Sequence, residues 1–296
     1  YVPETKTIVV TGKGIREVNQ PSGYIESSFP IETEYVIFEG CEIEGSLAWL
    51  FYGLNELKAV DFTKLTMKNV TSFQDMFGGC RSLISLNLDN FDSSQVTDMS
   101  LMFYDCSSLA TLDLSNLDTG SVRNMDQMFG GCQTLGELDL SSFDTRNVTT
   151  MEHMLIGCDS LVVLHTPKVM GEAVTRLPAY YVDASGKQTV DLTAAFADTV
   201  LTKTENENVG FVDGTSNDIL WVYDPETKTT VITGKGYRSV MYIYQPSCFP
   251  KETEYIRFED CEIKESYGSL FADLNNLKAI DFTNLKVTNP TAYTSM

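Results

Sequence analysis

Four cysteines at a constant spacing are the first residues whose chemistry must be weighed. They lie 26 residues apart, at Cys80, Cys106, Cys132 and Cys158. Thiols can act as nucleophiles, metal ligands or disulfide partners, but the paired CxxC spacing of zinc sites is absent. Leu54 and Leu274 stand at the same position of two other units, and a position that accepts leucine favours packing. We therefore expect buried, inert thiols, and the redox state of Cys41, Cys248 and Cys261 stays open.

The remaining candidates for catalysis do not form a motif. The chain has two histidines, His153 and His165, and neither has a serine or cysteine partner at a motif spacing. The position of His153 accepts different residue types in the other units, so we expect that side chain to face solvent. Thr-Gly-Lys-Gly at 11–14 recurs at 233–236 without the GxxxxGK[ST] spacing of a phosphate loop, which favours a turn. The sequence predicts no enzyme activity, no cofactor and no metal ion.

The acidic composition excludes further classes of function. Lysine and arginine number 21 against 41 for aspartate and glutamate, so the formal net charge is -20. This charge repels nucleic-acid phosphates and anionic membrane surfaces. No run approaches the ~20 apolar residues of a membrane helix, and residues 1–10 lack the pattern of a signal peptide. We expect no nucleic-acid binding and no direct membrane insertion by this segment.

A 26-residue repeat must position these residues. The units align as SFQDMFGGCRSLISLNLDNFD, DMSLMFYDCSSLATLDLSNLD, NMDQMFGGCQTLGELDLSSFD and TMEHMLIGCDSLVVLHTP. Apolar and polar residues alternate in runs such as LDLSN, which predicts a short half-buried strand. A turn is expected next, because a carboxylate there can accept backbone N–H groups. These carboxylates belong to Asp92, Asp118 and Asp144. Met99, Met102 and Phe103 then have the i, i+3, i+4 spacing of a short helix that ends near Gly-Gly.

Units of this kind cannot bury their apolar side alone, so we expect a curved right-handed solenoid whose five tandem strands share one parallel sheet. The string C-x-S/T-L-x-x-L-D-L-S-x-F-D-T-x-x-V-x-x-M-x-x-M-F-x-G resembles the BspA-like leucine-rich repeat of surface proteins from Gram-positive gut bacteria and mycoplasmas. The resemblance covers residues 50–166 closely and 267–296 partially. It implies an α/β leucine-rich-repeat fold in a secreted or cell-surface bacterial protein with adhesive roles.

A longer repeat divides the chain into modules. PETKT and TGKG return at an offset of 222, and FPxETEY, CEI and LKA(V/I)DFT return at an offset of 220. We expect β-rich caps at 1–49 and 221–266, a repeat array at 50–166, a β-rich hairpin and linker at 167–220, and the start of a second array at 267–296. Met296 aligns with Met76 inside a unit, so the parent protein is expected to continue.

The polar column of the predicted strands is the candidate binding surface. One outward residue per unit lies about 4.8 Å from the next. The column comprises Asp61, Asn87, Asp113, Asp139 and His165, with Glu137 beside it. In-register acids need water, hydroxyl partners or a cation, so a solvated face, a partner surface and a weak calcium site all stay open.

We expect a non-catalytic protein that binds a host or bacterial surface protein, best a basic one, through this concave strand face. A glycan-binding module is the first alternative, because sugars favour exposed aromatic side chains. Such side chains are carried in the β-rich flanks by Tyr180, Tyr181, Tyr242 and Tyr244. A purely structural spacer in a larger surface protein is the second alternative.

Overall fold

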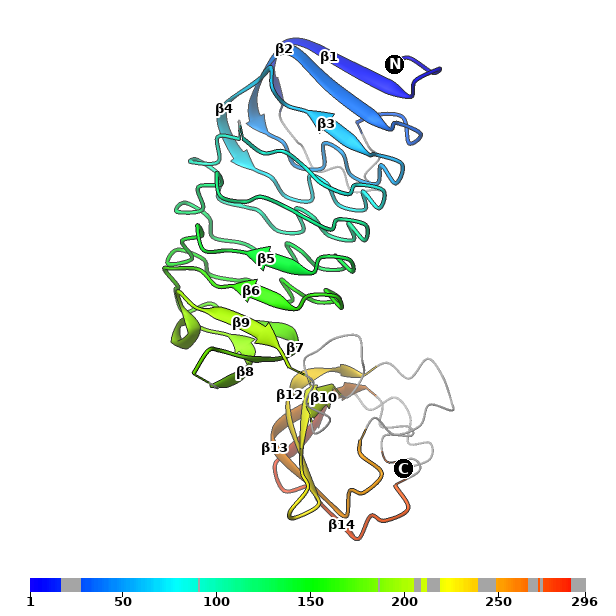
Figure 1. Ribbon diagram of the computed structural model, residues 1–296, viewed down its shortest axis with the longest axis vertical. Helices are drawn as coiled ribbons and strands as arrows, with labels where there is room; N and C mark the ends of the chain where they lie inside the picture. Colours follow the sequence, from blue (N-terminus) through cyan, green and yellow to red (C-terminus); the bar gives the residue numbers. More distant parts are fainter. Residues whose placement is uncertain are drawn as a thin grey trace. The chain divides into compact units, whose positions relative to one another are not determined.

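The computed structural model describes residues 1–16, 28–89, 91–185, 187–204, 209–211, 219–238, 249–265, 271 and 274–288. The chain divides into two compact units, Tyr1–Lys203 (unit 1) and Thr204–Met296 (unit 2). Short strands dominate both units, and η1 (Ala194–Phe196), a 3₁₀ turn, is the single helix among the described residues. The repeats therefore build a β-solenoid, shown in Figure 1. The short helices expected for an α/β leucine-rich-repeat fold are not formed in the described repeats.

Unit 1 begins with a parallel sheet. Its strands are β1 (Thr7–Arg16), β2 (Tyr35–Ser46), β3 (Ala59–Asp61) and β4 (Leu65–Ser72). β2 pairs in parallel with the other three, so the segment predicted as a β-rich N-terminal cap supplies the first strands of the ladder. The TGKG run lies inside β1, at a register shift between Thr11 and Lys13, where Gly12 has φ 100. The structure therefore has a bulge within a strand where the sequence predicted a turn.

An antiparallel group ends unit 1. β5 (Glu137–Asp139) and β6 (Val163–His165) are parallel, and β9 (Val200–Lys203) then pairs antiparallel with β6. β7 (Thr175–Val182) and β8 (Gln188–Leu192) form the hairpin that Asp-Ala-Ser-Gly predicts, and β7 joins β9. Because β9 runs against β6, the parallel ladder stops there.

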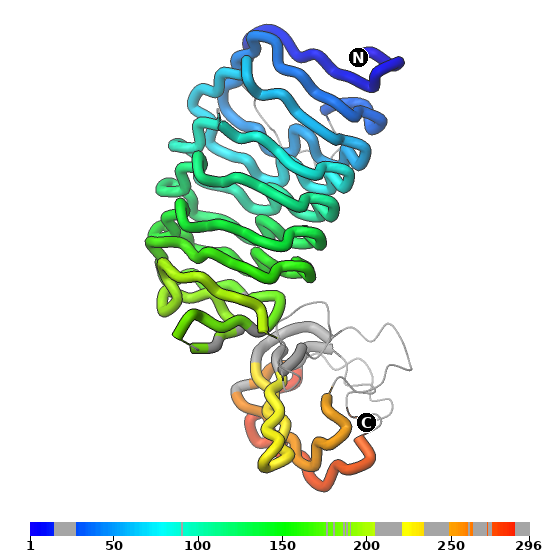
Figure 2. Tube along the Cα trace, in the orientation of Figure 1, coloured from blue at the N-terminus to red at the C-terminus, as the bar shows by residue number. Residues whose placement is uncertain are grey.

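The Met–Phe segments form stacked turns in place of the predicted helices. The backbone N–H of Phe77 donates to the carbonyl of Met102, and that of Phe103 to Met128, both at 2.9 Å. A helix would direct these N–H groups to carbonyls four residues earlier in the same segment. Here they join successive 26-residue turns, and the stacked turns can be followed along the tube in Figure 2. The i, i+3, i+4 spacing arises from two consecutive tight turns.

Each Met–Phe segment contains a residue with left-handed backbone. Asp75, Leu101, Gln127 and His153 have φ between 53 and 59. Their side chains differ because the shared property of this position is its backbone conformation. Gly79, Gly131 and Gly157 supply a second left-handed position four residues later, as the Gly-Gly signal predicts for a closing residue. His153 is half-buried, so the expectation that it faces solvent is corrected.

The core of unit 1 is a column of stacked rings inside the turns. Phe51, Phe77, Phe103 and Phe129 stack with centroid separations of 5.1, 5.6 and 5.7 Å. Leu86 and Leu138 are buried as predicted, whereas Leu112 is half-buried. The expected single sheet is interrupted, because residues 85–87 and 111–113 lie in the strand positions without forming strands. The ladder is regular where Asp139 pairs with His165 in the β5–β6 register.

Unit 2 repeats the opening sheet of unit 1 and adds a hairpin. Its strands are β10 (Val209–Phe211), β11 (Ile219–Asp224), β12 (Thr229–Arg238), β13 (Tyr255–Glu265), β14 (Ala279–Asp281) and β15 (Leu285–Thr288). β13 pairs in parallel with β12, β14 and β15, while β10, β11 and β12 are antiparallel neighbours.

Candidate functional site

The predicted binding column has a role in the backbone turns that its sequence pattern did not reveal. Asp61 Oδ1 accepts the N–H of Thr63 at 2.9 Å, and Asn87 Oδ1 accepts that of Asp89 at 2.8 Å. Asp113 and Asp139 accept the N–H two residues later in the same way, at 2.9 and 2.8 Å. Each of these side chains therefore closes a turn at the end of its strand segment, which explains the Asp/Asn column without a ligand.

The three aspartates of this column are ionised and lie on the surface. Hydrogen bonds from the Thr63 side chain and backbone lower the pKa of Asp61, and those from Ser115 lower the pKa of Asp113. The Ser141 side chain lowers the pKa of Asp139 in the same manner, against a smaller opposing effect of burial. Because the turn uses one carboxylate oxygen, the charge and the second oxygen stay available to a partner.

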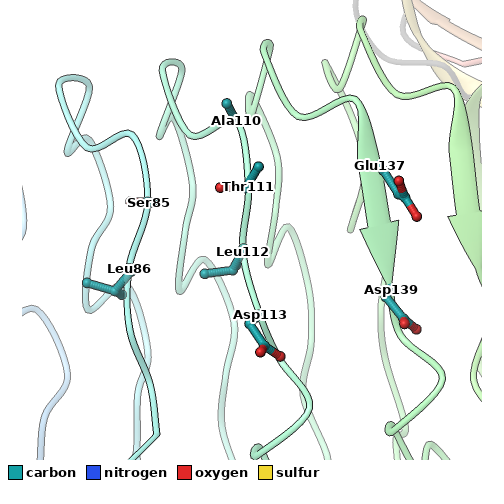
Figure 3. A pocket seen from close by; sticks show the side chains of 8 residues that line it. All are labelled: Ser85, Leu86, Ala110, Thr111, Leu112, Asp113, Glu137 and Asp139. Carbon is teal, nitrogen blue, oxygen red and sulfur yellow. The ribbon is translucent and has the colours of Figure 1, made fainter.

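Three of the predicted residues come together in a groove on this face. The groove has a volume of about 480 Å³. It is lined by Ser85, Leu86, Ala110, Thr111, Leu112, Asp113, Glu137 and Asp139. Figure 3 shows the carboxylates of Asp113, Glu137 and Asp139 on two neighbouring segments of the solenoid. The groove lies where the strand ladder is interrupted, and the half-buried Leu112 contributes to its floor.

The other predicted residues lie at the edges of this group. Asp61 and Asn87 belong to the preceding turns and do not line the groove. His165 follows Asp139 in the β5–β6 register, and its Nε2 lies 3.2 Å from Oε1 of Glu137. A protonated imidazole there would neutralise part of the acidic surface. The candidate site is therefore the groove formed by Asp113, Glu137 and Asp139, bordered by His165.

Charge is arranged differently on the first strands of unit 1. Glu34 lies between Lys6 and Lys58, with N–O separations of 2.8 and 2.5 Å. Glu42 lies between Lys13 and Lys68 at 3.2 and 3.1 Å. Within the part of the chain that the structure describes, no lysine or arginine forms an ion pair with Asp113 or Asp139. Among the described residues, Asp113 and Asp139 thus lack the lysine pairs that Glu34 and Glu42 have, while Glu137 lies beside His165.

The repeat cysteines are buried, free thiols, as the sequence predicts. Each Sγ–H also donates to the carbonyl of a phenylalanine 29 residues earlier, as from Cys106 to Phe77 at 3.1 Å. Burial raises the pKa of all four thiols, to about 12 for Cys158. The thiolate needed for nucleophilic chemistry is therefore strongly disfavoured. Cys41 is also a free, buried thiol, Cys261 is buried, and Cys248 lies outside the described residues.

Two further residues depart from the sequence-based interpretation. Tyr181, an expected glycan-facing side chain, is fully buried, and its hydroxyl donates to the Leu161 carbonyl at 2.7 Å. The side chains of Tyr180, Tyr242 and Tyr244 lie outside the described residues. Asp75 is buried at 9% exposure, and burial raises its pKa to about 7 despite a hydrogen bond from Trp49. The sequence gave little indication that Asp75 is buried, because its position holds different residue types in the other units.

The described residues contain neither a metal-binding cluster nor a membrane-spanning helix. No group of three or more His, Cys, Asp or Glu side chains is arranged there to hold a metal ion. Within the same residues, no helix has the length and apolar character needed to cross a membrane.

The repeats of unit 1 match a known protein family. A family described as "Mycoplasma protein of unknown function, DUF285" matches residues 45–163, which are the 26-residue turns of unit 1. No curated protein and no solved structure matches the chain. The turns of unit 1 are thus similar to a mycoplasma family without an assigned function, and the comparisons do not identify the BspA-like leucine-rich-repeat family.

Proposed function

We propose that this chain is a non-catalytic surface module whose strand face binds a basic segment of another protein. The observation that carries the proposal is the groove in which the carboxylates of Asp113, Glu137 and Asp139 come together. Among the described residues, neither aspartate forms an ion pair with a lysine or arginine. The resemblance of the repeats to BspA-like proteins supports a secreted or cell-surface location and a role in adhesion to host or bacterial proteins. The similarity to a mycoplasma family is compatible with such a location.

Electrostatics favours a lysine- or arginine-rich partner. The whole chain carries a formal charge of -20, which attracts cationic partners at long range. Within the groove, carboxylates on adjacent turns can each accept a hydrogen bond from a cationic side chain. Small and hydroxyl-bearing residues, Ser85, Ala110 and Thr111, leave room for such a chain to lie against the face. Exposed charges are screened over about 8 Å at physiological salt, so binding should weaken as salt rises.

A structural spacer is the rival with a specific observation in its favour. The turn-closing bonds of Asp61, Asn87 and Asp113 account for the Asp/Asn column without any partner. Glu137 is the residue that distinguishes the two functions, because its carboxylate contacts the His165 side chain and is not part of these turn-closing bonds. A spacer needs no carboxylate at this position.

The proposal is tested with a fluorescent decalysine peptide and the full chain, at low and physiological salt. The test variant combines Asp113→Asn, Glu137→Gln and Asp139→Asn, since Asn keeps the oxygen that closes each turn. The control variant combines Glu152→Gln, Asp159→Asn and Glu172→Gln, which removes the same charge from exposed positions outside the groove. We expect the groove variant to bind at least about 10-fold more weakly than the control variant.

Two results would contradict the proposal. If both variants lose affinity equally, the peptide responds to net charge and the groove is not a site. If the wild-type chain does not bind the peptide even at low salt, the spacer function is supported instead. Circular dichroism of both variants confirms that neither substitution set unfolds the chain.

A further inference from the structure

The strand face of unit 1 changes in character from one turn to the next. Each strand segment contributes two outward side chains, one on either side of a buried one. On β2 these are Tyr35 and Ile37, and the register places them beside Ala59 and Asp61 of β3. β2 thus brings an aromatic and an aliphatic side chain to the same face whose later turns carry small and acidic ones.

Tyr35 is an exposed ring in an ordered setting. It is 40% exposed, although β2 is paired on both sides, with β1 and with β3. The ammonium of Lys58 lies 6.0 Å from the ring centroid, and the same lysine forms an ion pair with Glu34 at 2.5 Å. An aromatic side chain on a doubly paired strand loses little conformational entropy when a partner covers it, which suits it to binding.

Unit 2 presents the same feature at Tyr255. Its strands β13 and β14 copy β2 and β3, with the corresponding parallel register. Tyr255 is 41% exposed, and the ammonium of Lys278 lies 5.8 Å from its ring centroid and 2.5 Å from Glu254. Arg257 stands in the place of Ile37. The exposed ring beside a paired lysine is therefore a repeated feature of the opening strands.

Small side chains separate Tyr35 from the acidic groove. In the column of Tyr35, the next three turns carry Ala59, Ser85 and Thr111, all exposed, and the fourth carries Glu137. Ser85 and Thr111 already line the groove, so this column leads directly from the tyrosine to the acids. Figure 1 shows β3 and β5 on the same side of unit 1, and Figure 3 shows Thr111 and Glu137 on neighbouring segments.

We propose that Tyr35, Ile37 and the acidic groove form one two-part docking surface for an extended polypeptide that carries an aromatic side chain and, further along, two lysines or arginines. The aromatic side chain packs against Tyr35 and Ile37, and the cationic side chains pair with Asp113 and Glu137. This inference rests on the proposed function, because the groove must accept a cationic segment. It adds the second contact and the spacing between the two.

The stacking of the turns sets the spacing that the partner must have. Neighbouring strands of a sheet lie about 4.8 Å apart, so the turn of Asp113 is about 14 Å from that of Tyr35, and the turn of Glu137 is about 19 Å away. An extended polypeptide covers about 3.3 Å per residue, so these distances correspond to about four and about six residues. Side chains at i, i+4 and i+6 of an extended chain point to the same side. The surface therefore fits an aromatic residue at i with cationic residues at i+4 and i+6.

Two peptides of identical composition test this register. The matched peptide is Trp-Ser-Thr-Ser-Lys-Ser-Lys. The shifted peptide, Trp-Ser-Thr-Lys-Ser-Lys-Ser, moves both lysines to i+3 and i+5, on the opposite side of an extended chain. Both carry the same fluorophore and blocked ends, and their binding to the full chain is measured at low salt by fluorescence anisotropy. We expect the matched peptide to bind at least about 5-fold more tightly than the shifted one.

A pair of variants tests the aromatic contact. Tyr35→Thr removes the ring and keeps a β-branched residue that suits a strand. Its matched control is Tyr255→Thr, which removes the equivalent ring from unit 2, and circular dichroism reports whether both variants fold. We expect Tyr35→Thr to weaken the matched peptide at least about 5-fold and to leave decalysine binding unchanged. Tyr255→Thr should leave both affinities unchanged.

The possible outcomes separate this inference from the proposed function. If decalysine binding depends on the groove acids but Tyr35→Thr binds the matched peptide like the wild type, the aromatic contact is overturned and the groove stands. Equal binding of the two peptides to the wild-type chain would overturn the spacing, and this comparison decides even if Tyr35→Thr does not fold. A matched peptide that depends on Tyr35 but not on Asp113 and Glu137 would also contradict a two-part surface. The proposed function itself fails only when decalysine binding does not depend on the groove acids.

Discussion

The first strands and the middle turns of unit 1 place their acidic side chains in opposite ways. Glu34, just before β2, and Glu42, within it, each lie between two lysines that come from the neighbouring turns. In the middle turns, Asp113, Glu137 and Asp139 face hydroxyl groups and one histidine. Both regions belong to one stack of turns with similar backbone spacing. The stacking of the turns itself therefore does not require a lysine partner for each exposed acid.

The contrast extends to unit 2, where Glu254 lies between Lys228 and Lys278 at 2.9 and 2.5 Å. The lysine–glutamate arrangement is therefore a property of the opening strands of each copy. Cross-strand pairs of opposite charge stabilise such a sheet, whereas like charges in register oppose it. The middle turns carry the carboxylates of Asp113, Glu137 and Asp139 on two neighbouring segments without this arrangement of lysines.

The largest effect is expected at Asp75, which is neither paired with a cation nor exposed. Its Oδ1 is buried without a hydrogen-bond partner among the described residues. Burial raises the pKa from 3.8 to about 7, so the folded protein holds this proton more tightly than the unfolded chain does. The stability contributed by the neutral form is therefore lost as pH rises from about 4 to 7. The loss amounts to about 4 kcal/mol, since one pKa unit corresponds to about 1.4 kcal/mol.

Asp75→Asn removes this titration and keeps a residue that tolerates the left-handed backbone. Chemical denaturation at pH 4.5 and pH 8 should show that the difference in unfolding free energy, variant minus wild type, increases with pH. The comparison between the two proteins cancels the titration of the other acids. A difference that does not change with pH would show that Asp75 is solvated in the folded state.

A smaller effect is expected from Glu34→Gln, which breaks two ion pairs on the first strands. The Lys58 and Lys6 side chains lower the pKa of Glu34, so its contribution is present above the ordinary pKa of 4.5 and is lost as pH falls through the lowered value. We expect a lower thermal midpoint at pH 7 and low salt, and a smaller difference from wild type at high salt.

Two matched variants sharpen this test. Glu254→Gln removes the equivalent residue from unit 2 and should destabilise that unit in the same direction. Glu39→Gln removes a half-exposed glutamate that pairs with Lys64 at 3.4 Å, and should change little. Equal effects from Glu34→Gln and Glu39→Gln would show that the double pairing contributes nothing specific.

Sequence periodicity predicted the repeated framework because it reports side chains that recur in one column. The 26-residue step, the buried cysteines and the turns at Asp92, Asp118 and Asp144 are all present in the structure. The prediction of helices was wrong because two consecutive tight turns produce the same i, i+3, i+4 apolar spacing as one helical turn. The left-handed position of Asp75 escaped detection because it specifies a backbone angle and accepts several side chains.

The candidate site was predicted in its composition and missed in its geometry. The outward column from Asp61 to Asp139 was identified, but its bonds to backbone N–H groups were assigned only to the second aspartate column. The groove depends on an interruption of the ladder and on the half-buried Leu112, and neither follows from a pattern that is the same in every unit. The lysines around Glu34 come from turns 24 or more residues away, so their pairing requires the register of the fold.

The smallest effect is expected at Asp113, where the turn and the charge can be separated. Asp113→Asn keeps an oxygen that can accept the N–H of Ser115, as Asn87 does for Asp89. It also removes a charge that faces Asp139, so the thermal midpoint should stay within a degree or rise slightly at low salt. Asp113→Ala removes the acceptor as well, leaves the Ser115 N–H without this partner, and should lower the midpoint by a few degrees. Differential scanning calorimetry of both variants at two salt concentrations resolves these contributions.

If the Ala and Asn variants behave alike, the turn-closing bond contributes nothing measurable to stability. The aspartate column would then require another explanation, and partner binding would be the first to examine. If Asn instead destabilises the chain as much as Ala, the negative charge itself stabilises the middle turns, and the contrast with the lysine-paired strands would no longer hold.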